Sequence, residues 1–83
     1  MAMRVLIVDD EALARDRLAR MLGQLGDYVV VGQAANGRDA LEQAGRLRPD
    51  VVLLDIRMPG MDGLEAARHL AALAEPPAVV FCT

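Results

Sequence analysis

The chain has no lysine and no tryptophan, and Tyr28 and Phe81 are its only aromatic residues. All nine basic residues are arginines, and twelve acidic residues outnumber them, so the formal net charge is −3. A protein that binds nucleic acid directly normally carries a basic face and exposed aromatic side chains. The composition therefore argues against direct nucleic-acid binding by this segment.

Cysteine and long apolar runs are also scarce. Cys82 is the only cysteine, so no internal disulfide can form and nothing indicates an oxidising compartment. No apolar run approaches the roughly 18 residues of a transmembrane helix. Residues Met1–Arg4 lead into a strand pattern and not into a signal peptide. We therefore expect a cytoplasmic protein without a membrane span.

Apolar residues, in contrast, are plentiful. The chain has 83 residues, of which 54% are hydrophobic and 25% are charged. A disordered chain would be less apolar, and a chain of this length has room for one small hydrophobic core. We expect residues 1–83 to form a single domain.

The order of apolar segments predicts an α/β fold. Four short apolar runs, several of them rich in β-branched residues, predict strands at residues 4–8, 28–32, 51–54 and 78–83. The first of them is predicted to be buried on both faces. Apolar residues at helical spacing predict helices from 11 to about 23, from 37 to 47 and from 63 to Pro76. The residues expected to face inward are Ala14, Leu18, Met21, Leu22, Leu25, Ala40, Leu41, Ala44, Leu47, Leu64, Ala67, Leu70 and Ala71.

Two pairs of polar residues predict helix starts. Asn36 with Asp39 has the spacing of an N-cap followed by an acidic residue in the first turn. Asp62 with Glu65 has capping-box spacing. Both helices should begin directly after the capping residue.

Three arginines and the single cysteine are expected to have structural roles and to take no part in catalysis or ligand binding. Arg15, Arg17 and Arg20 lie opposite the apolar stripe of the first helix, a pattern typical of a solvated face. Cys82, inside an apolar strand, is expected to be a small core side chain and not a reactive thiol.

Three aspartates follow two of the predicted strands. Asp9 and Asp10 come directly after the first strand, and Asp55 comes directly after the third. Strands that alternate with helices make a parallel sheet, and the chemistry of such sheets lies outside the carboxyl ends of the strands. If the first and third strands are neighbours, about 4.8 Å apart, the three carboxylates converge on one site.

Converging carboxylates repel one another, and a divalent cation relieves that repulsion. Oxygen ligands favour Mg²⁺ or Mn²⁺ over zinc, which prefers histidine or cysteine. A carboxylate beside such a cation can attack a phosphoryl group, and Asp55 is the candidate nucleophile. Met58–Gly60 and Asp62–Gly63 predict a tight loop after it. The alternative is that each aspartate is only a turn or N-cap residue.

Three segments carry a specific resemblance to a known family. VDDE at 8–11, LLDIRMPGMDG at 53–63 and VVFCT at 79–83 are similar to the receiver domain of two-component response regulators. Within that family, DDEALARDRLARML and PPAVVFCT resemble receivers that carry a LytTR-type DNA-binding output domain. The resemblance implies a flavodoxin-like, doubly wound parallel sheet with strand order 2-1-3-4.

Matched position by position, the resemblance also implies roles for individual residues. Asp55 would be the phosphoacceptor, Asp10 a direct Mg²⁺ ligand and Asp9 a ligand through water. The main-chain carbonyl of Arg57 would be a further ligand, with Mn²⁺ as a possible substitute ion. Thr83 would be the hydroxyl residue that bonds the phosphoryl group when the domain switches.

The sequence departs from the family pattern in one functional group and three elements. Receivers use a lysine after a fifth strand to contact the phosphoryl oxygens, and this chain contains no lysine. The family's fourth helix, fifth strand and fifth helix have no counterpart in residues 1–83. We therefore expect a single, incomplete receiver domain.

The expected function is that of a signalling module and not of a turnover enzyme. The resemblance implies transfer of a phosphoryl group from a histidine kinase to Asp55, with signalling to an output domain absent from this chain. One alternative is a haloacid-dehalogenase-like Mg²⁺ phosphatase, which needs an aspartate where Arg57 stands. The other is a phosphorylation-independent interaction or dimerisation module.

Crossover handedness adds an expectation about assembly. Parallel crossovers are almost always right-handed, so order 2-1-3-4 places the first helix on one face of the sheet and the other two helices on the opposite face. One helix cannot cover four strands, and the last strand has an open edge. We therefore expect a homo-oligomer or a swapped dimer.

Overall fold

All four predicted strands join in one parallel sheet in the computed structural model, which describes residues 2–57 and 63–82. The element order is β1 (Met3–Val8), α1 (Ala12–Leu25), β2 (Tyr28–Ala34), α2 (Gly37–Leu47), β3 (Val51–Asp55), α3 (Gly63–Ala71) and β4 (Ala78–Cys82). The strand order is β2-β1-β3-β4, and every neighbouring pair is parallel. The predicted α/β fold and strand order are confirmed.

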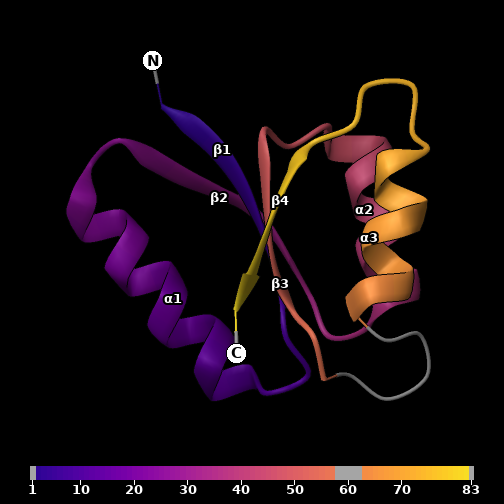
Figure 1. The fold of residues 1–83 in the computed structure, drawn as a ribbon. Coiled ribbons are helices and arrows are strands. Elements are labelled where there is room, and N and C mark those ends of the chain that lie inside the picture. Colours follow the sequence, from indigo (N-terminus) through magenta and orange to yellow (C-terminus); the bar gives the residue numbers. More distant parts are fainter. Residues whose placement is uncertain (1, 58–62, 83) are drawn as a thin grey trace.

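The helices lie on opposite faces of the sheet. Helix α1 covers one face, while α2 and α3 lie together on the other (Figure 1), as right-handed crossovers require. The main core lies between the sheet and the α2–α3 layer. Its buried members are Leu6, Val8, Ala34, Ala40, Ala44, Val52, Leu54, Ala66 and Leu70.

The ends of the elements follow local chemistry. The Asp39 amide donates to Asn36 Oδ1 at 2.8 Å, which confirms the predicted N-cap of α2. Helix α1 ends where Gly26 adopts a left-handed φ of 81°, a conformation that glycine adopts without steric cost. Helix α3 ends at Ala71, before the predicted stop at Pro76. Asp62, the predicted cap of α3, lies outside the described residues.

The inward-facing residues predicted for α1 and α3 are partly wrong. Met21 and Leu25 of α1 are 56% and 62% exposed, and Leu64 of α3 is 59% exposed; Ala71 is exposed as well. Helix α1 contacts mainly β2 and β1, so the sheet covers only part of its wide apolar stripe. Helix α3 is short, and Ala66 and Leu70 already fill its contact with the core.

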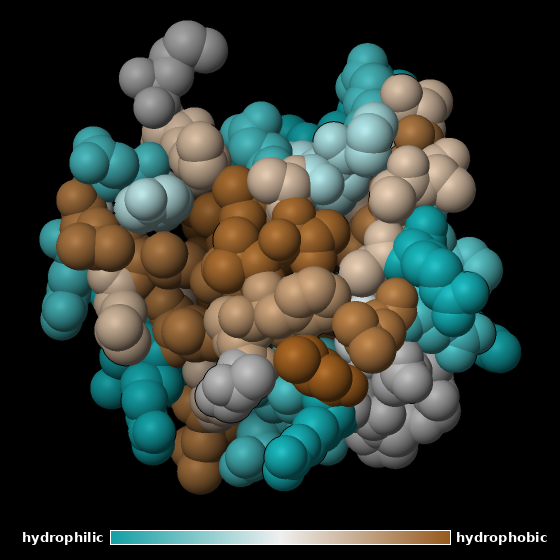
Figure 2. Space-filling view, viewed as in Figure 1, coloured by the Kyte–Doolittle hydropathy of each residue, from teal (hydrophilic) through white to brown (hydrophobic). Residues whose placement is uncertain are grey.

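An apolar groove of about 250 Å³ therefore remains open between α1 and the sheet. Figure 2 shows hydrophobic residues gathered there, over the strands between α1 and α3. The groove is lined by Met3, Val5, Leu22, Leu25, Tyr28, Val51, Leu53 and Val80. Among the described strands, β4 pairs only with β3, so its other edge presents unpaired backbone groups next to this groove.

No helix within residues 2–57 and 63–82 combines the length and the apolar character that crossing a membrane would require.

We expect a polypeptide of residues 1–83 to self-associate at micromolar concentration through β4. Val80 is 49% exposed in the apolar groove, and burying it together with the strand edge removes apolar surface and unpaired backbone groups from water. Val80→Lys places a charge on this face and should shift the population toward monomer in sedimentation-velocity ultracentrifugation.

Leu64→Lys is the matched control, because Leu64 is also an exposed apolar residue but lies on α3, on the other side of the sheet. It should leave the association unchanged. A monodisperse monomer of the unmodified polypeptide would contradict the expectation.

Candidate metal centre

The three predicted aspartates meet at the carboxyl edge of the sheet. Strands β1 and β3 are neighbours with Val8 opposite Leu54, so the next residues, Asp9 and Asp55, lie side by side. One carboxylate oxygen from each of Asp9, Asp10 and Asp55 lies within 4.8 Å of the other two. Asp9 and Asp55 are half-buried and Asp10 is exposed. The predicted convergence is confirmed.

Hydrogen bonds hold the turn that carries Asp9 and Asp10. The Asp9 amide donates to the carbonyl of Ala34 at the end of β2, at 3.0 Å. Asp9 Oδ1 accepts from the Glu11 amide at 2.9 Å, and the Asp9 carbonyl accepts from Arg15 Nη1 at 2.7 Å. The turn is thus tied both to the neighbouring strand and to α1.

Asp55 is held by the segment that follows it. Its Oδ1 accepts from the Arg57 amide at 3.1 Å, and the Gly63 amide returns to the Ile56 carbonyl at 3.0 Å. Arg57 is exposed, and the role of its carbonyl as a ligand stays a prediction. The predicted loop residues Met58–Gly60 and the predicted switch residue Thr83 lie outside the described residues.

Gly63, predicted from the sequence as part of a turn and as the first residue of the third helix, also has a packing role. A Cβ built on Gly63 would lie 2.5 Å from the Ile56 Cα and 2.7 Å from the Asp55 carbonyl oxygen. Both neighbours are backbone atoms, which cannot rotate away as a side chain can. The signal available in the sequence was the Asp-Gly pair, whose glycine is needed here for close backbone approach behind Asp55.

Cys82 lies beside the acidic cluster, because it is opposite Asp55 in the β3–β4 register. It lines a cavity of about 370 Å³ together with both Asp9 and Asp55. Burial raises the pKa of the Cys82 thiol above its usual value, and the charges of Asp9 and Asp55 raise it further. The thiol therefore stays protonated near neutral pH, which supports the structural role predicted for it.

The donor set fits a hard divalent cation. It offers only carboxylate oxygens, and among the described residues none of the three aspartates takes part in an ion pair. Two oxygens bound directly to one Mg²⁺ lie at most about 4.2 Å apart, given ligand distances of about 2.1 Å. Carboxylate oxygens that lie within 4.8 Å of one another are close to that limit, so small side-chain movements would let them share one cation.

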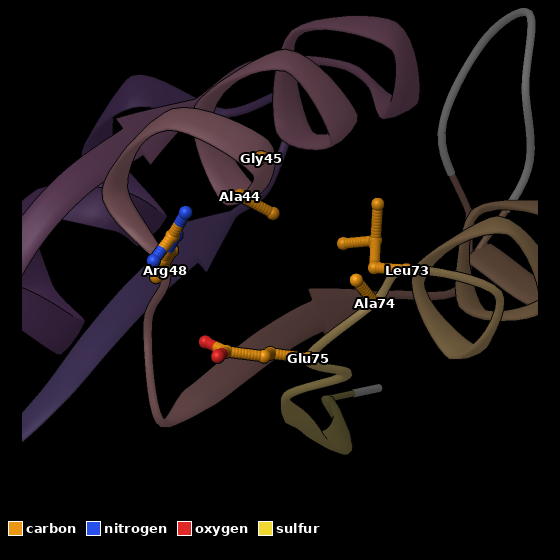
Figure 3. Close-up of a pocket in the computed structure, with 6 residues that line it drawn as sticks. All are labelled: Ala44, Gly45, Arg48, Leu73, Ala74 and Glu75. Atoms are coloured by element: carbon orange, nitrogen blue, oxygen red, sulfur yellow. The ribbon is translucent and has the colours of Figure 1, made fainter.

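A second cavity, of about 240 Å³, lies far from this chemistry. It is bordered by Ala44, Gly45, Arg48, Leu73, Ala74 and Glu75, between α2 and the segment after α3 (Figure 3). Arg48 precedes β3 and Glu75 precedes β4, so the cavity lies at the amino ends of the strands. It is at the opposite edge of the sheet from the aspartates and adds nothing to their site.

A family model described as the response regulator receiver domain matches residues 5–83. The chain belongs to the response regulator receiver family. The resemblance carried by the aspartate motifs is thereby confirmed, and the acidic cluster lies where that resemblance placed it.

Known relatives and solved structures agree with this assignment. The receiver is 60% identical to the positive alginate biosynthesis regulatory protein of Pseudomonas aeruginosa, over 98% of this chain and 33% of that protein. It is 47% identical to a protein-glutamate methylesterase/protein-glutamine glutaminase of Alkalilimnicola ehrlichii, over 98% of this chain and 21% of that protein. The chain thus spans a third or less of these two relatives.

Among solved structures, the response regulator domain of Thermotoga maritima CheB superposes with a TM-score of 0.92 at 40% identity, covering 98% of this chain and 60% of that one. CheY in the CheX-CheY-BeF3-Mg²⁺ complex of Borrelia burgdorferi gives a TM-score of 0.88 at 27% identity, covering 95% of this chain and 60% of the matched chain.

The close approach at Gly63 predicts a large cost for a single methyl group. Gly63→Ala forces the backbone behind Asp55 to move, and we expect a loss of about 1–3 kcal/mol in the free energy of unfolding. Urea denaturation followed by circular dichroism measures this loss.

Gly23→Ala is the control, because Gly23 lies inside α1 with open space around its Cβ position. It should raise the free energy of unfolding by about 0.5–1 kcal/mol. Equal effects of the two substitutions would refute the packing argument.

Proposed function

We propose that residues 1–83 belong to a single receiver domain that accepts a phosphoryl group on Asp55, with Mg²⁺ held at the acidic cluster. The observation that carries the proposal is the convergence of Asp9, Asp10 and Asp55 within 4.8 Å at the carboxyl edge of a receiver fold. The phosphoryl donor is a histidine kinase, as the family membership implies.

The aspartates have separate roles in this proposal. Asp10 is a direct ligand of the cation, Asp9 acts through water, and the Arg57 carbonyl completes the protein's ligands. When bound, the cation would neutralise negative charge on the phosphoryl oxygens. Mn²⁺ offers the same preference for oxygen and can replace Mg²⁺.

Asp55 is well placed to act as the nucleophile. Its Oδ1 accepts from the Arg57 amide, which orients the carboxylate and leaves Oδ2 without a hydrogen bond among the described residues. Oδ2 forms a bond to phosphorus as the bond from phosphorus to the kinase imidazole nitrogen breaks. Thr83 then provides the hydroxyl that bonds the phosphoryl group in the switched state.

The output of the whole protein belongs to the same proposal. The 60% identity to the positive alginate biosynthesis regulatory protein supports a transcription regulator with a LytTR-type DNA-binding domain. The receiver segment itself, with its net charge of −3 and no lysine, transmits the signal and does not contact DNA. We place it in the cytoplasm, where kinase and DNA are both accessible.

Two observations favour a second function for a polypeptide of residues 1–83. Residues 1–83 contain no lysine to contact the phosphoryl oxygens, and among the described strands β4 pairs only with β3. A phosphorylation-independent interaction or dimerisation module needs no lysine at a phosphoryl site, and the edge of β4 offers it a surface for pairing. Phosphatase turnover is disfavoured, because Arg57 stands where the acid/base aspartate of such enzymes is needed.

Divalent cations should stabilise the chain through the acidic cluster. At a cation concentration one hundred times the Kd, mass action adds about 2.7 kcal/mol to the free energy of unfolding. Asp10→Asn should remove most of the Mg²⁺- or Mn²⁺-dependent rise in Tm, because it replaces a charged ligand with a neutral one. Differential scanning calorimetry with and without the cation measures the shift.

Asp16→Asn serves as the control, since Asp16 pairs with Arg20 on the exposed side of α1. Its cation-dependent shift should equal that of the unmodified chain. Asp10→Asn also relieves repulsion within the cluster, so the comparison must use the shift and not the absolute Tm. An undiminished shift in Asp10→Asn would exclude Asp10 as a ligand.

Acetyl phosphate with Mg²⁺ should label the chain on Asp55, and Asp55→Asn should abolish the label in intact-mass spectrometry. We expect the labelling to be slower than that of the CheB receiver measured in parallel. The reason is that residues 1–83 contain no lysine, so no lysine ammonium group neutralises the phosphoryl oxygens in the transition state of the transfer.

Asp16→Asn should be labelled like the unmodified chain. Labelling of Asp55→Asn would move the nucleophile to another residue. A complete absence of label with Mg²⁺ bound would favour the interaction module.

A further inference from the structure

Arg15 differs from the other arginines of α1. The sequence predicts a solvated face for Arg15, Arg17 and Arg20, and this is wrong for Arg15. Its side chain is half-buried, and its Nη1 donates to the Asp9 carbonyl at 2.7 Å. Arg20 instead forms an exposed ion pair with Asp16, and Arg17 forms no hydrogen bond or ion pair among the described residues.

The hydrogen bond from Arg15 acts on the peptide group between two predicted metal ligands. The Asp9 carbonyl belongs to the peptide that joins Asp9 to Asp10, and that peptide is planar. Fixing its oxygen therefore fixes the Asp10 amide in the same plane. The same plane contains the Cα atoms of Asp9 and Asp10, which carry the two side chains. By holding the plane, Arg15 restrains where both carboxylates lie.

Besides the bond from the Asp9 amide to the Ala34 carbonyl, few other groups restrain this turn. Glu11, the N-cap residue of α1, makes no side-chain capping bond, and the first turn of α1 contains no acidic residue. Asp9 Oδ1 accepts from the Glu11 amide, but that bond engages one of the ligand carboxylates itself. The bond from Arg15 is charge-assisted, which makes it stronger than a bond between neutral groups.

The choice of acceptor also matters. Arg15 bonds a carbonyl and forms no ion pair with any of the three aspartates. A guanidinium paired with a carboxylate would compete with a cation for the same oxygen atoms. Bound to the carbonyl, the guanidinium holds the turn and leaves the carboxylate oxygens available.

The geometry points to Arg15 as a positioning residue that orients Asp9 and Asp10 for a divalent cation. This inference rests on the proposed cation site. Partners that orient metal ligands typically change metal affinity by about 10–100-fold when they are removed. We expect Arg15→Gln to weaken Mn²⁺ binding by about tenfold in isothermal titration calorimetry of the 83-residue chain.

The sign of the effect separates positioning from simple charge. Removing a positive charge near a cation site, with nothing else changed, strengthens cation binding by reducing repulsion. Positioning predicts the opposite for Arg15→Gln. Arg17→Gln is the matched control, because Arg17 lies on the same helix and lines the cavity that holds Asp9 and Asp55 but makes no bond to the turn. It should leave the affinity unchanged or slightly tighter.

Arg15→Lys tests whether the charged donor is what matters. It keeps a charged donor on a long side chain, so it should recover part of the affinity lost in Arg15→Gln. No recovery would show that a charged donor at this position does not restore the site, and it would overturn the inference. The Glu11 amide signal in NMR spectra verifies that each variant retains a folded turn before titration.

The outcomes distinguish this inference from the function on which it rests. If the unmodified chain does not bind Mn²⁺, both fail. If it binds Mn²⁺ through Asp10 and Arg15→Gln binds equally or more tightly, the cation site stands and the role of Arg15 is refuted.

Discussion

The site depends on the pairing of β1 with β3. Asp50 sets the register at the amino end, where its Oδ2 accepts from the Arg4 amide and its own amide donates to the Arg4 carbonyl, both at 2.8 Å. From that point the strands run in parallel to Val8 and Leu54, which brings Asp9 beside Asp55. A slip of one residue would reverse the faces of the strand and separate the carboxylates, so core packing and site geometry are fixed by one register.

This arrangement collects negative charge at one edge of a small domain, which opposes folding when no cation is bound. The chain limits that cost without neutralising the aspartates. Asp9 Oδ1 and Asp55 Oδ1 accept backbone amides, and the Arg15 guanidinium bonds a carbonyl. Each of these bonds places a positive dipole or charge beside the cluster while leaving carboxylate oxygens for a ligand, so repulsion is reduced and not removed.

Strand runs, helix spacing and the aspartates after two strands made most of the fold and the acidic cluster predictable. Those signals are local, because β-branched runs and capping residues act within a few positions of the chain. The exposure of Met21, the close approach at Gly63 and the bond from Arg15 were not predictable in the same way. Each depends on which segment lies opposite in three dimensions, and periodicity alone does not contain that information.

The acidic cavity and the open apolar groove lie next to each other on the sheet. Cys82 lines the cavity with Asp55, and Val80, two residues earlier on β4, lines the groove. Side chains two apart on a strand share a face, so a segment packed on Val80 also borders the cavity at Cys82. A segment that covers this face therefore changes the solvation of Asp9 and Asp55. By thermodynamic linkage, a cation bound at the aspartates changes the affinity of that segment for the face.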